Sequence, residues 1–425
     1  MNKKITDSKS FCLAPWMSIH TWPDGRTFPC CAWDMKTPVG NANDSTISQI
    51  WNNSAMKKTR KLMLEGKEVK GCSRCYYMER TSGSSYRLKI NKDFRHTLNY
   101  VEETQDSGHL DSMNIHLWDL RLSNFCNFKC RTCGLDLSSS WYSDHKAMFG
   151  HAKKALINLK DKSKFLQEIE PHYNCVDEIY FAGGEPLLMP DHYSILKKLI
   201  ELNRTDVKIR YSTNFSSLIF KNKHIFDYWK HFKNLEIYIS VDGVGKIGEY
   251  VRKGFNYEKF LKNVLELKNS NLNTYTTAYA VTYSTLNYLH LFDLVIDFFE
   301  KGILTKEYNA EKYYIDFSPV TNPDYYDAAF LPDKFKKDFN FRLNNFDQEL
   351  LNIGVDSRVI KNILTKLNIV NSRVNEGKFN YKNMQKLKKV TDKLDELREE
   401  KLDSVFDYFD SSLDFLDLNL ERSLI

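Results

Sequence analysis

The sequence contains no apolar run approaching the roughly eighteen residues that a membrane-spanning helix needs. Its first ten residues, MNKKITDSKS, also lack the apolar core of a secretory signal peptide. We therefore expect a cytoplasmic protein with no membrane partner. In that compartment the nine cysteines should be thiols or metal ligands, because disulfides belong mainly to oxidising compartments.

A strong charge bias is absent as well. The net charge of +6 is a small surplus of 61 basic over 55 acidic side chains. Basic clusters occur at residues 57–61 and 382–389, but no tract alternates basic with stacking aromatic residues, as single-stranded nucleic acid would require. The basic clusters are most simply solvated helix faces, and no specific nucleic-acid partner is indicated.

The most informative motif in the sequence is a set of three cysteines with the spacing CxxxCxxC. Cys126, Cys130 and Cys133 follow an extended apolar stretch at residues 115–122. Three thiolates from one loop can bind a [4Fe-4S] cluster and leave its fourth iron without a protein ligand in this motif. Short cysteine clusters also hold zinc, so the spacing alone leaves a zinc knuckle open.

Strand-like and helix-like segments alternate from residue 115 onward, which is typical of parallel sheets joined by helical crossovers. The expected strands are residues 115–122, 176–181, 207–213, 235–241, 276–282 and 313–318. The expected helices are residues 191–203, 225–232, 257–268 and 288–300. Right-handed crossovers should build an α/β fold with a parallel sheet. Six strands are too few for a closed eight-stranded barrel, and chemistry is expected at the C-terminal strand ends.

A Gly-Gly-Glu-Pro turn at residues 183–186 follows the second strand. Together with CxxxCxxC, this turn resembles the radical S-adenosylmethionine (SAM) enzymes, and the resemblance covers residues 113–328. It implies an open partial (β/α)6 barrel, a catalytic [4Fe-4S] cluster on the three cysteines, and SAM chelated to the fourth iron. One electron then splits the sulfonium to a 5'-deoxyadenosyl radical that abstracts hydrogen. The resemblance also implies an electron donor of the flavodoxin or ferredoxin type.

The same resemblance implies further cofactor-binding residues. Gly183, Gly184 and Glu185 resemble the motif that receives the methionyl amine of SAM, although Gly and Pro also mark ordinary turns. An arginine suits the SAM carboxylate because its guanidinium fork can bind both oxygens. The alternatives are a solvated surface arginine and, for an asparagine, a simple turn-former. The remaining expected SAM contacts are Asn214, Ser240 and Arg252.

A second set of cysteines precedes the barrel, within residues 8–100. A hairpin with strands at residues 14–22 and 26–31 is expected around the Pro-Asp-Gly turn at residues 23–25, followed by a helical stretch and a CxxC pair. The arrangement resembles the twitch half of a SPASM domain and implies an auxiliary [4Fe-4S] cluster. Its expected ligands are Cys12, Cys30, Cys72 and Cys75, with Cys31 in reserve. A four-cysteine zinc site has an equally correct ligand count.

The last hundred residues, 329–425, read as a helical extension. Phe335, Phe339, Phe346 and Leu350 form one apolar stripe, and Leu387, Val390, Leu394 and Leu397 form another. The second stripe keeps heptad spacing too briefly for a coiled coil, so we expect it to dock against the barrel, with a partner-binding helix as the alternative. The acidic stretch at residues 403–417 is expected to cover the open side of the barrel.

The sequence therefore predicts a radical SAM enzyme that cleaves SAM reductively, and the family resemblance favours modification of a peptide or protein side chain. Two other classes stay open. One is radical chemistry on a small molecule such as a sugar or nucleotide, and the other is a non-enzymatic zinc-binding interaction protein. No general base or substrate-reading residue can be named from spacing alone, because a pocket depends on side chains that face each other.

Overall fold

The computed structural model describes residues 8–151, 154–272, 275–308 and 313–405. The chain divides into two compact units. The first comprises Met1–Phe125, Leu156–Ser212 and Asp227–Leu235, and the second comprises Cys126–Ala155, Thr213–Phe226 and Glu236–Ile425. In the described part of the chain, no helix combines the length and the apolar character needed to cross a membrane.

The first unit is built on strands in the order β3-β2-β1-β4-β6-β7. Their bounds are β1 Ser18–Thr21, β2 Arg26–Phe28, β3 Gly40–Asn41, β4 Leu117–Leu120, β6 Glu178–Phe181 and β7 Lys208–Thr213. Strands β1, β4, β6 and β7 run parallel, whereas β2 is antiparallel to both β1 and β3. The first three expected barrel strands are thus confirmed, in the expected parallel arrangement.

The N-terminal hairpin is confirmed, with one correction. Gly25 adopts φ +86° in the turn between β1 and β2, a conformation that favours glycine. The residues before β1 form the short helix α2 (Ala14–Met17) and not the expected strand, with Pro15 in its first turn, where the fixed φ of proline suits a helix start. Strand β1 also pairs in parallel with β4, a long-range pairing that the sequence did not reveal.

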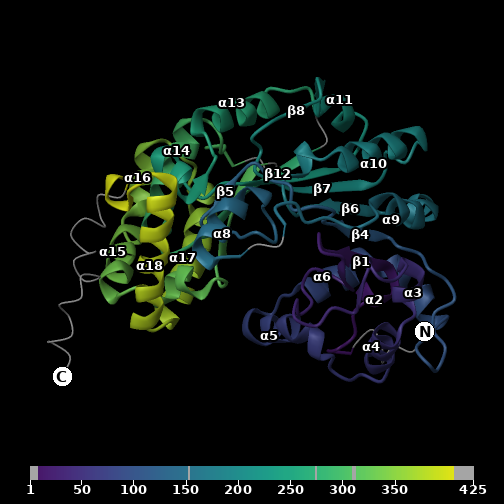
Figure 1. The fold of residues 1–425 in the computed structure, drawn as a ribbon. Coiled ribbons are helices and arrows are strands. Elements are labelled where there is room, and N and C mark those ends of the chain that lie inside the picture. The colour runs from purple at the N-terminus through teal and green to yellow at the C-terminus, as the bar shows by residue number, and fades with distance from the viewer. Residues whose placement is uncertain (1–7, 152–153, 273–274, 309–312, 406–425) are drawn as a thin grey trace. The chain divides into compact units, whose positions relative to one another are not determined.

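Alternation along these strands gives the sheet of the first unit an apolar and a polar face. On the apolar face, Phe181 and Tyr211 pack against His192 of helix α10 (Pro190–Glu201), which lies beside β7 (Figure 1). The opposite face carries Asp119, Tyr180 and Arg210, aligned by the strand register. The other helices of this unit are α3 Ile47–Trp51, α4 Ser54–Leu64, α5 Ser73–Ser82, α6 Tyr86–Asp93, α7 Asn99–Glu102 and α9 Lys162–Ile169.

The second unit contains the other expected strands, in the order β10-β12-β13. Their bounds are β10 Leu235–Ser240, β12 Tyr275–Tyr283 and β13 Tyr313–Pro319, and β12 and β13 are parallel. Two short antiparallel pairs join β5 (Lys129–Cys130) to β11 (Arg252–Lys253) and β8 (Ile219–Phe220) to β9 (Lys223–His224). The intervening helices are α8 Tyr142–Phe149, α12 Gly245–Val251, α13 Tyr257–Lys268 and α14 Leu291–Glu300. The helix expected at residues 225–232 is shortened to α11 (Phe226–Trp229).

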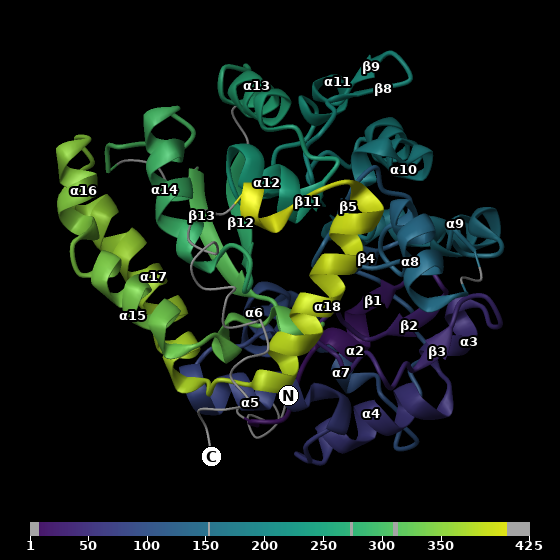
Figure 2. The ribbon, with the colours of Figure 1, turned by 60° about the vertical axis from the view of Figure 1, so that its left-hand side comes forward.

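The C-terminal extension is helical, as expected. Its helices are α15 Asp333–Leu343, α16 Phe346–Asn352, α17 Ser357–Glu376 and α18 Tyr381–Arg398, and Figure 2 shows α15 and α17 side by side. The first apolar stripe is divided between α15 and α16, and Phe339 stacks on Tyr288 with ring centroids 4.2 Å apart. This helical region therefore docks within the second unit. The acidic stretch lies outside the described residues from residue 406 onward.

Candidate functional site

The loop that carries Cys126, Cys130 and Cys133 is held by the Ser-Ser-Trp segment that follows it in the second unit. The Cys126 carbonyl accepts a hydrogen bond from Ser140 Oγ at 2.7 Å, and the Cys130 carbonyl accepts one from Trp141 Nε1 at 2.8 Å. The Cys133 amide donates to the Cys130 carbonyl at 3.0 Å. These bonds fix the backbone of the loop through contacts that do not involve the thiols.

Two N–H donors approach the sulfur of Cys126. The Phe128 amide lies 3.4 Å from Cys126 Sγ, and the Asn214 side-chain amide lies 3.8 Å from it. Hydrogen bonds to sulfur are one means by which proteins tune iron–sulfur clusters, and soft thiolates suit such clusters. Three thiols on one loop with amide donors around them therefore fit a cluster. The structure places Asn214, an expected SAM contact, at the sulfur of Cys126.

Arg252 lies directly beside the cysteine loop. Strand β11 pairs with β5 so that Arg252 stands opposite Cys130. Its Nη1 donates to the buried Asp242 carboxylate at 2.9 Å, while its buried Nε has no hydrogen-bond partner among the described residues. The guanidinium is thus held by one carboxylate and retains a donor for another, so its donor set fits the SAM carboxylate.

Burial and neighbouring charges both shift the pKa values of these groups. Burial alone would lower the pKa of Arg252, but Cys130 and Asp242 raise it above its usual value, so the guanidinium stays charged. Burial raises the pKa of Cys130 and raises that of Cys133 to about 12, with the Cys130 charge adding to the second shift. Both thiols are therefore protonated near neutral pH until metal binding releases their protons to solvent.

Asp242 received no role from the sequence. It follows β10, where its carboxylate accepts hydrogen bonds from Arg252 and from the Thr282 amide at 2.8 Å. Ser240, an expected SAM contact, is the last residue of β10 and is half-buried. The ISVDG segment therefore supplies both the rim serine and the carboxylate that orients the arginine, and its position at a strand end was the available signal.

A buried ion-pair cluster ties α18 to the cysteine loop, which the sequence also did not reveal. Arg131, between Cys130 and Cys133, is 1% exposed. Its Nη2 donates to Asp395, near the end of α18, and to Glu400 at 2.7 Å, and its guanidinium stacks over the Tyr250 ring at 3.6 Å. A charged side chain this deeply buried needs such partners.

A second ion pair repeats this connection. Arg398, in the last turn of α18, donates to Asp144 of α8 at 2.8 Å, and the same carboxylate accepts from Lys129 at 2.8 Å. The end of α18 thus holds the loop at two points. We call this set of pairs, Arg131 with Asp395 and Glu400 and Arg398 with Asp144, the α18 clamp.

The Gly-Gly-Glu turn lies in the first unit, after β6. Gly183 has φ +109°, and a Cβ on Gly184 would lie 2.1 Å from the Phe125 carbonyl oxygen. The Glu185 amide donates to that carbonyl at 2.7 Å. Both glycines therefore permit a close approach to the segment that leads directly into Cys126. The Glu185 carboxylate is buried and accepts a hydrogen bond from the Leu187 amide at 3.0 Å.

The structure brings Cys12, Cys30, Cys72 and Cys75 together in the first unit. All four are buried, and burial raises the pKa of each thiol, that of Cys12 to about 12. Cys12 interacts electrostatically with each of the other three. Burial also raises the pKa of Cys31, but the main electrostatic neighbours of this thiol are Asp119 and Arg121. Cys30 is thus the member of the adjacent pair that joins the other thiols.

The spacing of these thiols bears on the choice between zinc and iron–sulfur. Four thiolates bound to one zinc at about 2.3 Å would lie about 3.8 Å apart. Among the described residues, no three cysteine sulfurs lie within 4.8 Å of one another. A cubane binds each thiolate to a different iron and so accepts thiols that lie farther apart than the ligands of a single zinc ion.

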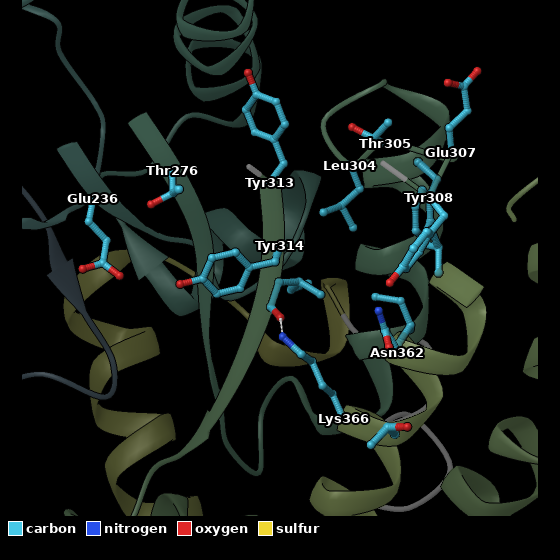
Figure 3. A pocket seen from close by; sticks show the side chains of 15 residues that line it. Glu236, Thr276, Leu304, Thr305, Glu307, Tyr308, Tyr313, Tyr314, Asn362 and Lys366 are labelled. Atoms are coloured by element: carbon cyan, nitrogen blue, oxygen red, sulfur yellow. Dashed lines mark hydrogen bonds between the residues drawn. The ribbon is translucent and has the colours of Figure 1, made fainter. Parts of the chain in front are cut away.

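A separate cavity of about 940 Å³ lies in the second unit, between the first residues of β10, β12 and β13 and helix α17. Glu236, Thr276, Tyr314 and Lys366 are among its lining residues, and Lys366 Nζ donates to the Ile315 carbonyl at 2.5 Å (Figure 3). Burial lowers the pKa of Lys366. The cavity opens at the N-terminal strand ends, opposite to Asp242, so it is distinct from the cysteine site.

Comparison with protein families gives two matches. Residues 120–295 match the model of the radical SAM superfamily, and residues 12–76 match SPASM, an iron–sulfur cluster-binding domain. The first match implies a [4Fe-4S] cluster and SAM, and the second implies auxiliary iron–sulfur. A search of curated proteins found no match.

Among solved structures, native anSMEcpe with bound AdoMet and Cp18Cys peptide is 16% identical at a TM-score of 0.37, covering 56% of this chain and 61% of that one. SuiB of Streptococcus suis bound to the precursor peptide SuiA is 15% identical at a TM-score of 0.37, with coverages of 69% and 63%. The chain thus spans less than two thirds of the length of these proteins.

The family matches agree with the expected α/β fold class, a partial (β/α)6 barrel with an N-terminal iron–sulfur domain and a helical C-terminal region. Residues 120–295 therefore form a radical SAM domain, and a SPASM domain at residues 12–76 precedes it.

Proposed function

We propose that this protein is an enzyme that binds a [4Fe-4S] cluster on Cys126, Cys130 and Cys133 and cleaves SAM reductively beside it. The observation that carries the proposal is the β5–β11 pairing, which fixes a charged, partly unsatisfied arginine opposite one of the three cysteines. When bound, the cluster would supply one electron to SAM and release a 5'-deoxyadenosyl radical. The protein supplies binding, orientation and exclusion of water.

Each SAM-binding residue has a distinct task in this proposal. Arg252, oriented by Asp242, holds the SAM carboxylate, and Glu185 receives the amine. Asn214 donates to Cys126 Sγ and so tunes a cluster ligand, while Ser240 lies at the strand end where a ribose hydroxyl would need a polar partner. The backbone of Gly183 and Gly184 completes the turn that positions Glu185.

An auxiliary [4Fe-4S] cluster is proposed on Cys12, Cys30, Cys72 and Cys75. Four protein thiolates satisfy all four irons, so this cluster has no open site for substrate. Electron transfer or support of the substrate pocket are the roles that remain. An electron donor of the flavodoxin or ferredoxin type is proposed as the partner that reduces the clusters.

The proposed substrate is a peptide or protein side chain. The polar face of the first-unit sheet supports a polar, charged substrate, because Arg121 pairs with Asp119 at 3.3 Å and Arg210 pairs with Glu178 at 2.6 Å on neighbouring strands. A sugar or nucleotide would also suit such a face and is the second candidate. Detection of the modification on a peptide, and not on a sugar or nucleotide, would distinguish the first candidate substrate from the second.

The overall proposal is tested by anaerobic reconstitution, iron and sulfide analysis, and an assay for 5'-deoxyadenosine after SAM and dithionite are added. We expect about eight irons per chain and deoxyadenosine formation, since two cubanes hold about eight irons. About four irons with activity would reassign the N-terminal cysteines to zinc. Zinc without iron or deoxyadenosine would exclude the enzyme.

Replacement of Glu185 by Ala should weaken SAM binding while leaving the iron content unchanged. A hydrogen bond to a charged group contributes about 1.5–3 kcal/mol, which corresponds to a loss of SAM affinity of roughly tenfold to a hundredfold. Equilibrium binding of SAM to the reconstituted protein measures the effect, with Glu201→Ala on the exposed surface of α10 as the control. Lost iron with unchanged SAM affinity would show that Glu185 supports the cysteine loop instead.

Replacement of Arg252 by Gln should also reduce SAM affinity by at least about tenfold, because the charge-assisted bonds to the carboxylate are lost. The Asp242 carboxylate would lose its cation as well. The Arg252→Lys variant keeps the charge but lacks the guanidinium fork, so its SAM affinity should lie between those of the wild type and Arg252→Gln. The control is Lys246→Gln, an exposed cation on α12. Equal SAM affinity in wild type and Arg252→Gln would remove Arg252 from the site.

A further inference from the structure

Another group of metal-ligating side chains lies in the first unit and includes none of the cysteines assigned above. His96 belongs to the 3-10 turn η2 (Arg95–Leu98), His116 directly precedes β4, and Asp177 directly precedes β6. One ligand atom from each lies within 4.8 Å of the other two. No other trio of histidine, cysteine, aspartate or glutamate in the described ranges meets this distance.

The geometry of the trio is close to that of a metal centre. Asp177 Oδ2 lies 2.7 Å from His96 Nε2 and 2.8 Å from His116 Nδ1. Zinc bound at about 2.0–2.1 Å would separate tetrahedral ligands by about 3.3 Å, so an outward shift of about half an ångström admits the ion. The His96 side chain is 55% exposed and that of Asp177 is 39% exposed, which gives both the freedom to move.

The surroundings of the trio fit the same interpretation. His116 Nε2 faces the Tyr100 hydroxyl at 3.3 Å, and a ligating histidine usually has such a partner on its other ring nitrogen. Arg204 lies within electrostatic reach of Asp177, but its guanidinium donates to Asp206 and to backbone carbonyls.

We propose that His96, His116 and Asp177 form a zinc site with water as the fourth ligand. Two imidazoles and one carboxylate with an open position are a ligand set that zinc takes in proteins. The site joins a turn of the N-terminal helical region to the starts of two adjacent strands, so bound zinc ties three segments of the first unit together.

The position of the site gives it a structural role. Asp177 precedes β6, and the Gly-Gly-Glu turn begins at Gly183, after the same strand. Six residues of extended chain span roughly 20 Å. The zinc site is thus at the opposite end of the strand from a proposed SAM-binding turn, and its occupancy should change the stability of the protein and not its chemistry.

The experiment uses the full chain with its iron–sulfur clusters reconstituted anaerobically. The protein is equilibrated with a small excess of zinc and desalted, and zinc and iron are measured by mass spectrometry together with the melting temperature. We expect one more zinc per chain in the wild type than in His96→Ala or Asp177→Asn, and a zinc-dependent rise in melting temperature in the wild type alone. His231→Ala, at an exposed histidine of the same unit, should behave as the wild type.

Zinc could also enter unfilled cysteine sites, so the decisive quantity is the difference between wild type and variants at equal iron content. His96 is more than half exposed, so His96→Ala tests the site even if Asp177→Asn does not fold. Equal zinc in the wild type and His96→Ala, with equal melting temperatures, would overturn the proposal. The three side chains would then be a hydrogen-bonded trio only.

Discussion

Replacing Cys126, Cys130 and Cys133 by Ala should abolish 5'-deoxyadenosine formation, whereas replacing Cys72 and Cys75 should leave uncoupled SAM cleavage partly intact. The first variant removes every protein ligand of the proposed catalytic cluster. The second removes half of the ligands of the proposed auxiliary cluster, which has no iron open to SAM. The assay compares deoxyadenosine formed per chain after addition of dithionite.

The control for both variants is Cys175→Ala, which removes a thiol that neither proposed cluster uses. Cys175 Sγ lies 3.4 Å from the His172 carbonyl oxygen, and its loss should leave iron content and cleavage unchanged. Equal loss of cleavage in the two cluster variants would mean that the N-terminal site is structural, or that both sites fold as a unit. Iron analysis distinguishes these two explanations, because only coupled folding would remove the iron from both sites together.

The strands were predictable because their signal is local. Alternating strands such as β7 and β10, in which every second residue is buried, carry their pattern within about ten residues. The same holds for amphipathic helices such as α13, which spans Tyr257–Lys268 as expected. The CxxxCxxC motif is also local. For these elements the physical cause, burial of one face or of a whole strand, is present in the sequence itself.

The remaining features depend on contacts between distant residues. The pairing of β1 with β4 joins residues about a hundred positions apart, and the partner of Arg131 lies 264 positions away. No periodicity in the sequence predicts the β1–β4 pairing or the Arg131–Asp395 contact. The choice between Cys30 and Cys31 likewise depends on which thiol faces the other cysteines in the folded hairpin. Two adjacent cysteines in a sequence do not indicate this.

Removing the Arg131 side chain should destabilise the second unit by about 3–5 kcal/mol, because Asp395 and Glu400 would lose their shared cation in a buried setting. The α18 clamp acts on the residues between Cys130 and Cys133, so the same change should also lower the iron retained after reconstitution. Arg131→Met keeps much of the volume of the side chain and is the variant of choice. Urea unfolding and iron analysis are the measurements.

A double-mutant cycle separates the clamp from a general packing effect. If the Arg131–Asp395 pair is the cause, Asp395→Asn combined with Arg131→Met should cost less than the sum of the two single changes, since the double variant removes the Asp395 charge together with its cation. Lys388→Met, at a cation of α18 that is paired with Asp392 on the same helix, is the matched control and should change stability by less than about 1 kcal/mol. Strict additivity in the cycle, with normal iron content in Arg131→Met, would show that α18 packs on the loop without positioning it. A coupled loss of stability and iron would instead make the C-terminal helix part of the machinery that shapes the cluster loop, across more than 250 residues of intervening chain.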